Sequence, residues 1–423
     1  MTPAGHTETA RVGWRALLAA FGRIGILSFG GPAAQIALMH REIVDRRKWV
    51  AEADYLSALS FCMLLPGPEA MQLATWIGWR LKGTAGGLAA GLLFVLPGAL
   101  VVGALSALYV GLGHVPGVMA AFAGIQAAVI AVVIEALLRV AKRALKTRTA
   151  RVLALVAFAS LFLFALPFPV VILAAGLWGA LTARGQAKPA AHPPALRASL
   201  TAAATWGAVW LIPLAATQIF LPGLMADIAL FFSKLALLTF GGAYAVLAWM
   251  SQSVVTDYQW LTLTQMMDGL GLAETTPGPL ILVVQFVAFV AAAPQGWGAA
   301  VLAACIALWM TFAPCFLWIF AGAPWIARLT AMPRLSGALS AIMAAVVGVI
   351  GHLSLWFALH VIFARVEPLT AFPLHTIWPD PTSLRPLALG LAGLSAWVLL
   401  RRHWPLPLVL ALAASLSAAA NLL

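Results

Sequence analysis

Residues 28–31 read Ser-Phe-Gly-Gly, and residues 239–242 read Thr-Phe-Gly-Gly, an offset of 211 positions (239 − 28). The same offset superimposes Trp49 on Trp260 and the Pro-Gly-Pro of residues 66–68 on that of residues 277–279, without a gap. A six-residue insertion in the second half then brings Pro97 onto Pro314. So many matches at one offset indicate an internal repeat. We therefore predict two homologous domains, residues 1–183 and 225–423, joined by a segment at 184–224.

The composition excludes a water-soluble protein. Hydrophobic residues make up 63% of the 423 positions and charged residues only 9%, whereas soluble domains have about 25% charged residues. The net charge of +12 comes from Lys and Arg clustered between apolar runs, which is typical of cytoplasmic loops rather than of a nucleic-acid-binding surface. The chain is therefore predicted to be an all-α polytopic membrane protein that binds no nucleic acid.

Each half opens with two hydrophobic stretches that are interrupted in the middle. In the first half, Gly30-Gly31-Pro32 interrupts residues 14–39, and Pro66-Gly67-Pro68 interrupts residues 55–79. Proline removes a helix hydrogen bond and pushes the preceding residue out of the α region. Arms of about 12 residues cover roughly 18 Å, which is too short for a hydrocarbon core of about 30 Å. Re-entrant helical hairpins are the prediction, here and at Pro277-Gly278-Pro279.

The distribution of basic residues predicts that the two repeats have opposite orientations. The loop at 41–54 contains four Lys or Arg, whereas its counterpart at 251–262 contains none. The positive-inside rule then places the first loop and the N-terminus in the cytoplasm and the C-terminus in the periplasm. About 13 hydrophobic segments result. The continuous spans are predicted near 87–112, 117–140, 152–166, 169–183, 203–220 (the linker helix), 299–322, 337–360, 385–400 and 405–421.

The breaks are the candidate substrate site. Secondary transporters built from inverted repeats hold substrate near the bilayer midplane, where broken helices expose backbone N–H groups and a positive dipole end. Glycine lets an oxyanion approach this backbone closely. The hydroxyls of Ser28, Thr239, Thr275 and Thr276 either bond the substrate or cap helices. The substrate-binding residues predicted at the breaks are Ser28, Gly30, Gly31, Thr239, Gly241 and Gly242.

Two cations complete this site. Arg23 and Lys234 superimpose at the offset of 211. Each lies five residues before the Ser or Thr that precedes Phe-Gly-Gly. A cation inside an apolar segment costs at least about 2.5–3.5 kcal/mol and normally marks a substrate path or an ion pair. Two such cations suit a dianion. In the alternative interpretation, they extend to the interface or pair with an acid for structural reasons.

Three acids near the second breaks are candidates for proton coupling: Glu274, Glu69 and Asp268. A carboxylate in a low-dielectric setting can load and release a proton during transport, although Glu69 could equally stabilise a helix N-terminus. Glu135 and His352 superimpose at an offset of 217. For them we favour structural roles, with Glu135 paired to Arg139 and His352 a satisfied interior histidine.

No catalytic, cofactor or metal motif is predicted. Cys62, Cys305 and Cys315 lie in apolar segments without metal-ligand spacing, and they are expected to be small core residues. Neither a nucleotide-binding loop nor a hydrolase triad is present. The expected partners are an oxyanion, protons and the lipid bilayer, and the sequence leaves a homodimer open.

At these motifs the chain resembles the chromate ion transporter family in its long form with two fused domains, and the match covers nearly the whole chain. The resemblance implies an inner-membrane protein that expels chromate from the bacterial cytoplasm, driven by the proton gradient or the membrane potential, and confers chromate resistance. One departure concerns the position after Glu69-Ala70, where similar chains often have Gln and this one has Met71 before Gln72. The resemblance is carried by Ser28-Phe29-Gly30-Gly31-Pro32, Trp49, Leu65-Pro66-Gly67-Pro68-Glu69, Phe94-Val95-Leu96-Pro97, Lys234, Thr239-Phe240-Gly241-Gly242-Ala243-Tyr244 and the run Gly269 to Pro279.

Two other functions remain open from the sequence. A transporter for sulfate, a dianion of similar tetrahedral shape, would use the same cations and helix ends. A membrane-bound chromate reductase is a remote alternative, because it requires a redox cofactor and no haem or flavin motif is present.

Overall fold

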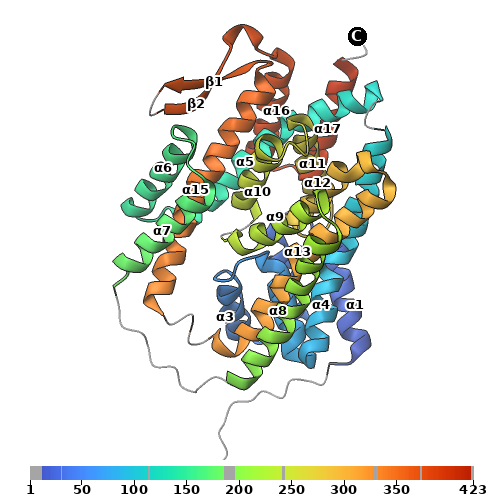
Figure 1. Cartoon of the computed structure of the whole chain (residues 1–423), viewed down its shortest axis with the longest axis vertical. Coiled ribbons are helices and arrows are strands. Elements are labelled where there is room, and N and C mark those ends of the chain that lie inside the picture. Colours follow the sequence, from blue (N-terminus) through green and yellow to red (C-terminus); the bar gives the residue numbers. More distant parts are fainter. Residues whose placement is uncertain are drawn as a thin grey trace, which may run out of the picture.

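The computed structural model describes residues 12–420 apart from 30, 113–114, 185–195, 241–242, 327–328, 330–331 and 372–373. Most of this part of the chain is helical (Figure 1). Five helices within it are long and apolar enough to cross a bilayer. The protein is therefore a multi-pass membrane protein. The five segments are Glu69–Leu112, Pro116–Ala144, Leu196–Phe220, Trp297–Trp325 and Pro333–Ile362.

The helices of the first half follow the predicted segments closely. They are α1 (Trp14–Leu27), α2 (Gly31–His40), the π-helical turn η1 (Arg41–Arg46), α3 (Glu52–Cys62), α4 (Glu69–Leu112), α5 (Pro116–Ala144), α6 (Arg148–Phe162) and α7 (Phe168–Thr182). The linker helix is α8 (Leu196–Phe220).

The second half repeats this order of α-helices and adds a β-hairpin and several short 3-10 turns. Its elements are α9 (Leu224–Leu238), α10 (Ala243–Gln252), η2 (Ser253–Asp257), α11 (Leu263–Thr275), η3 (Leu280–Leu282), α12 (Val283–Ala292), η4 (Ala293–Gln295), α13 (Trp297–Gly322), η5 (Ala323–Trp325), α15 (Pro333–Ile362), β1 (Val366–Ala371), β2 (Leu374–Pro379), η6 (Pro381–Ser383), α16 (Pro386–Arg402) and α17 (Leu406–Ala420).

The predicted breaks are present. α1 ends at Leu27 and α2 begins at Gly31, with arms of 14 and 10 residues, so each arm is only about 15–21 Å long. Gly67 and Gly278, the central residues of the two Pro-Gly-Pro motifs, have φ of +118° and +95°. Only glycine adopts these angles at low cost, and the glycine in each motif is what lets the chain turn there.

α4 is two helices joined at a turn. Lys82 and Gly83 have non-helical backbone angles, and a Cβ at Gly78 would lie 2.2 Å from the carbonyl oxygen of Gly86 and 2.6 Å from Cβ of Ala90. The arms before and after the turn therefore lie antiparallel and in close contact, as a re-entrant hairpin requires. Below, α4a denotes residues 69–81 and α4b residues 84–112.

The two halves exchange their terminal helices. α6 and α7 of the first half pack against α15 of the second, while α16 and α17 of the second half pack against α5 of the first. Small residues allow these helices to approach closely: a Cβ at Gly124 on α5 would lie 2.1 Å from the carbonyl oxygen of Ala413 on α17. Because each half packs mainly on helices of the other, the two repeats form one folded body.

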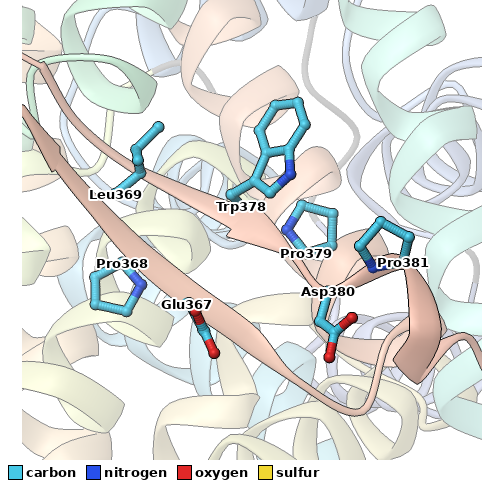
Figure 2. Close-up of a pocket in the computed structure, with 7 residues that line it drawn as sticks. All are labelled: Glu367, Pro368, Leu369, Trp378, Pro379, Asp380 and Pro381. Carbon is cyan, nitrogen blue, oxygen red and sulfur yellow. The ribbon is translucent and has the colours of Figure 1, made fainter.

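The β-hairpin is the element that the sequence analysis did not predict. β1 and β2 pair in antiparallel register, with Glu367 opposite Trp378. Arg365 forms a 2.7 Å ion pair with Asp380, and the N–H of His375 donates to the carbonyl oxygen of Leu163 in the α6–α7 loop. The hairpin lies near the same end of the molecule as the C-terminus, whereas α1, α3 and α8 lie towards the other end (Figure 1). Figure 2 shows the groove that its residues line.

Candidate functional site at the helix breaks

The breaks of the two halves meet in pairs. The N–H of Gly67 donates to the carbonyl oxygen of Thr239 at 2.8 Å, and the N–H of Gly278 donates to the carbonyl oxygen of Ser28 at 2.8 Å. Both donors and both acceptors are related by the repeat offset of 211 (278 − 67 and 239 − 28). Each Pro-Gly-Pro break, at 66–68 or 277–279, is therefore held against the α1–α2 or α9–α10 break of the opposite half.

A proline-containing helix of the opposite half supports each junction. A Cβ at Gly67 would lie 2.9 Å from Sγ of Cys315, and a Cβ at Gly278 would lie 3.2 Å from Cα of Gly98. Gly98 and Cys315 follow Pro97 and Pro314, and they correspond at the offset of 217 (315 − 98). The backbone of both junctions is thus tightly enclosed.

The hydroxyls at the breaks donate to the protein itself. Ser28 Oγ donates to the carbonyl oxygen of Ile24 at 2.6 Å, and Thr239 Oγ1 donates to that of Leu235 at 2.6 Å. Thr275 and Thr276 likewise donate to carbonyl oxygens of α11. These hydroxyls therefore cap the C-terminal rather than the N-terminal ends of helices, and their binding of the substrate stays a prediction.

Two glutamines that the sequence analysis did not single out hold the breaks. Gln35 Nε2 donates to the carbonyl oxygen of Gly278 at 2.7 Å, and Gln72 Nε2 donates to that of Pro66 at 2.7 Å. Both side chains are buried, and the Oε1 of each has no hydrogen-bond partner among the residues that the structure describes. Gln72 thus supplies an amide next to the buried Met71. The sequence contained a signal for both residues, because each is a lone amide side chain in an apolar segment beside a break.

The two cations lie on equivalent surfaces. Arg23 and Lys234 are both exposed, and exposed neighbours one turn away, Ile26 and Leu237, also correspond at the offset of 211. Arg23 lies close enough to Glu42 to lower the pKa of that carboxyl, which gives the structural interpretation an identified acid. The position equivalent to Glu42 in the second half is Ser253 (42 + 211), so Lys234 has no matching acid there.

The loop that follows α2 contains two groups of charges. Arg46 and Arg47 each bond the buried Glu42 carboxylate at 3.0 Å. Burial alone would raise the pKa of Glu42, but the hydrogen bond from Arg47 and the neighbouring positive charges together lower it. In the second group His40 contacts Asp45 and Glu52, and one ligand atom from each lies within 4.8 Å of the others. The sequence analysis predicted no metal motif and did not single out these three residues.

The three candidate acids differ in their surroundings. Glu69 begins α4 and is half-buried, and Glu274 near the end of α11 is also half-buried. Asp268 is only 3% exposed, and its carboxylate accepts hydrogen bonds from Tyr109 Oη and Gln126 Nε2, both at 2.8 Å. Asp268 therefore has the lowest exposed fraction of the three.

The structure confirms some predictions for the remaining residues and contradicts others. Glu135 forms the predicted ion pair with Arg139. The prediction of a satisfied histidine at 352 is wrong, since its buried Nδ1 has no hydrogen-bond partner within the described part of the chain. Cys305 is exposed rather than in the core. Gly31 has φ of +78° at the start of α2. Gly30, Gly241 and Gly242 lie outside the described residues.

Comparison with known proteins identifies the family of this chain. The family profile described as Chromate transporter matches residues 15–180 and 226–418. The chain is 34% identical to the "Chromate transport protein" of Pseudomonas aeruginosa over 90% of this chain and 87% of the relative. It is 30% identical to the protein of the same description from Cupriavidus metallidurans, over 82% and 84%, and to the "Probable chromate transport protein" of Synechococcus elongatus, over 89% and 94%. No solved structure matches the chain. Since the profile covers most of both repeats and these relatives align over most of their length, the chain belongs to the chromate transporter family, a family of transporters rather than enzymes.

Proposed function

We propose that the protein is a secondary active transporter that exports chromate from the cytoplasm, driven by the proton gradient or the membrane potential, and thereby confers chromate resistance. The paired breaks are the observation that carries this proposal. Two pseudo-equivalent junctions, Gly67 with Thr239 and Gly278 with Ser28, join broken helices of both halves. This is the kind of element that alternating access rearranges around a central substrate.

We assign the anion to the side of the breaks where α2 and α10 begin. Arg23 and Lys234 supply positive charge, and the N-terminal turns of α2 and α10 supply unpaired backbone N–H groups. The hydroxyls of Ser28 and Thr239 position the helix ends, because their protons already bond α1 and α9. The coupling proton is assigned to one of the three acids Glu274, Glu69 and Asp268.

The proposed topology has the two repeats inverted in the inner membrane. Its support is the charge difference between the loops at 41–54 and 251–262, together with the exchange of helices between halves. The N-terminus then lies in the cytoplasm and the C-terminus in the periplasm, and two copies could associate as a homodimer.

Transport in proteoliposomes tests the proposal. Purified protein is reconstituted, and chromate flux is measured with an imposed pH gradient, an imposed potential, or neither. Chromate flux that a gradient of either kind accelerates supports the proposal. Flux of sulfate with none of chromate would favour the sulfate transporter, and chromate reduction by the purified protein would favour the reductase.

A further inference from the structure

Asp268 joins the two halves at a buried position. It lies in the middle of α11, in the second half, whereas its two hydrogen-bond donors lie on α4b and α5 of the first half. Tyr109 Oη donates to Oδ2 and Gln126 Nε2 donates to Oδ1, both at 2.8 Å. Each carboxylate oxygen thus accepts one neutral donor from the opposite repeat.

The donors are held in place by aromatic packing. The ring of Tyr109 contacts Phe122 of α5 and Phe286 of α12 edge-on, with centroids 5.2 and 5.1 Å away. Phe286 also packs against α11, since a Cβ at Gly269 would lie 2.4 Å from its ring. The phenol therefore has little freedom to move away from Asp268 unless α4b and α11 themselves move apart.

Among the described residues of the neighbouring elements, no cation forms an ion pair with this carboxylate. The elements packed against α11 are α4, α5, α12, α17 and η3, and α12, α17 and η3 contain no titratable residue. On α5 the first charged residue comes nine positions after Gln126, about 13 Å along the helix. On α11 itself Glu274 lies six positions after Asp268, about 9 Å. The titratable residues on these elements are Glu69, Arg80, Lys82 and Tyr109 on α4, Glu135, Arg139, Lys142 and Arg143 on α5, and Glu274 on α11.

The charge state of Asp268 thus changes the contact between the halves. The ionised carboxylate accepts from both Tyr109 and Gln126, and burying it without a cation is costly unless those two bonds are made. A protonated Asp268 carries its own O–H, which needs an acceptor. Tyr109 Oη can accept it only if the phenol turns its own hydrogen elsewhere, and Gln126 Nε2 cannot accept it at all. At least one of the two bonds between the halves must then rearrange.

We propose that Asp268 is the residue that carries the coupling proton, and that Tyr109 and Gln126 are positioning residues that convert its protonation into separation of α11 from α4b and α5. The carboxylate takes a proton from water on one side of the membrane, and its hydrogen bonds to the first half then break. It later returns the proton to water on the other side. This inference rests on the proposed transport function, and it selects one acid of the three named there.

The test compares two kinds of chromate flux in proteoliposomes. Asp268→Asn keeps the size of the side chain, resembles the protonated acid in offering one acceptor and one donor, and does not titrate. We expect it to lose the stimulation by a pH gradient while it retains exchange of chromate between equal concentrations on the two sides. Tyr109→Phe keeps the packed ring and removes one hydrogen-bond donor to the ionised Asp268. The pH at which the rate of chromate exchange is half-maximal should therefore move upward. A merely structural role would lower stability without moving that midpoint.

Matched controls and a second measurement separate this inference from the proposed function. Asp227→Asn removes an exposed acid of α9, and Tyr258→Phe removes a phenol outside this cluster; both should behave as wild type. Infrared difference spectra between acid and alkaline pH should show a carboxylic acid carbonyl band that is missing in Asp268→Asn.

Three outcomes would overturn the inference. The first is that a pH gradient still stimulates flux fully in Asp268→Asn, and the second is that a well-folded Asp268→Asn loses both the stimulation and the exchange. The third is that the infrared band remains in Asp268→Asn. If wild-type protein moves no chromate, the proposed function fails, and the infrared band still decides whether Asp268 titrates.

Discussion

The backbone N–H of Gly278 donates a 2.8 Å hydrogen bond to the carbonyl oxygen of Ser28, and Gln35 of the same half as Ser28 bonds the carbonyl oxygen of Gly278. Both polar groups of one loop glycine in the second half are therefore bonded to the first half. A movement of the two halves relative to each other would break both bonds together, so we expect this junction to take part in any such movement.

A side chain at Gly278 should disrupt this junction. In Gly278→Ala the positive φ costs about 1–3 kcal/mol, and the new Cβ would lie 2.8 Å from Leu282 and 3.2 Å from Gly98, adding about 1–3 kcal/mol of overpacking. We expect lower thermal stability in detergent and loss of chromate flux. Gly296→Ala is the matched control, because Gly296 has φ of +104° but open space around it. Equal effects in the two variants would show that strain, rather than the junction, is responsible.

The loops at 41–54 and 251–262 should lie on opposite faces of the membrane. Single cysteines are introduced at exposed positions of each loop in a background without Cys62, Cys305 and Cys315, and are labelled with an impermeant reagent in intact cells. Only the loop at 251–262 should react before the cells are opened. Labelling of both loops from one side would exclude the inverted arrangement, and with it the pseudo-symmetric substrate site.

The positions of the breaks were predictable from the sequence, whereas their partners were not. The repeat offset and the Gly and Pro motifs located all four breaks. No continuous helix accommodates the Pro-Gly-Pro of residues 66–68 and 277–279, and the offset of 211 relates the Gly-Gly break of the first half to residues 241–242. An offset shows which residues are equivalent but not which half packs on which, so the cross-pairing of Gly67 with Thr239 required the structure. The roles of Gln35 and Gln72 also follow from that pairing.

The β-hairpin was missed for a related reason. Residues 363–385 form a segment between two spans, and Pro368 and Pro379 at its strands argue against strand structure in a sequence read alone. The Arg365–Asp380 ion pair and the contact with Leu163 stabilise the hairpin. These are contacts between residues distant in sequence.

Acid should remove a stabilising contribution of Glu42. Its pKa lies below the ordinary value of 4.5, so the carboxylate stabilises the folded state above that pH, and the contribution is lost as the pH falls through the lowered folded value. Glu42→Gln should therefore destabilise the protein by about 1–3 kcal/mol near neutral pH and by much less in acid. Thermal unfolding across pH measures this. The exposed Asp54, changed to Asn, is the control, and a pH-independent difference for Glu42→Gln would contradict the assignment.

Removing either break cation should weaken anion binding. A dianion that loses one of two cations loses a charge-assisted contact of about 1.5–3 kcal/mol, so Arg23→Gln or Lys234→Gln should weaken chromate binding by roughly tenfold or more. Arg23→Lys should be milder, because the charge remains and only the two-pronged guanidinium is lost. Arg15→Gln, an exposed arginine two turns earlier on α1, controls for surface charge. The affinity is measured by equilibrium binding of chromate to purified protein. Normal affinity in both Gln variants would place the anion elsewhere, and loss in Arg23→Gln alone would indicate that Arg23 acts through Glu42, the acid that only the first half contains.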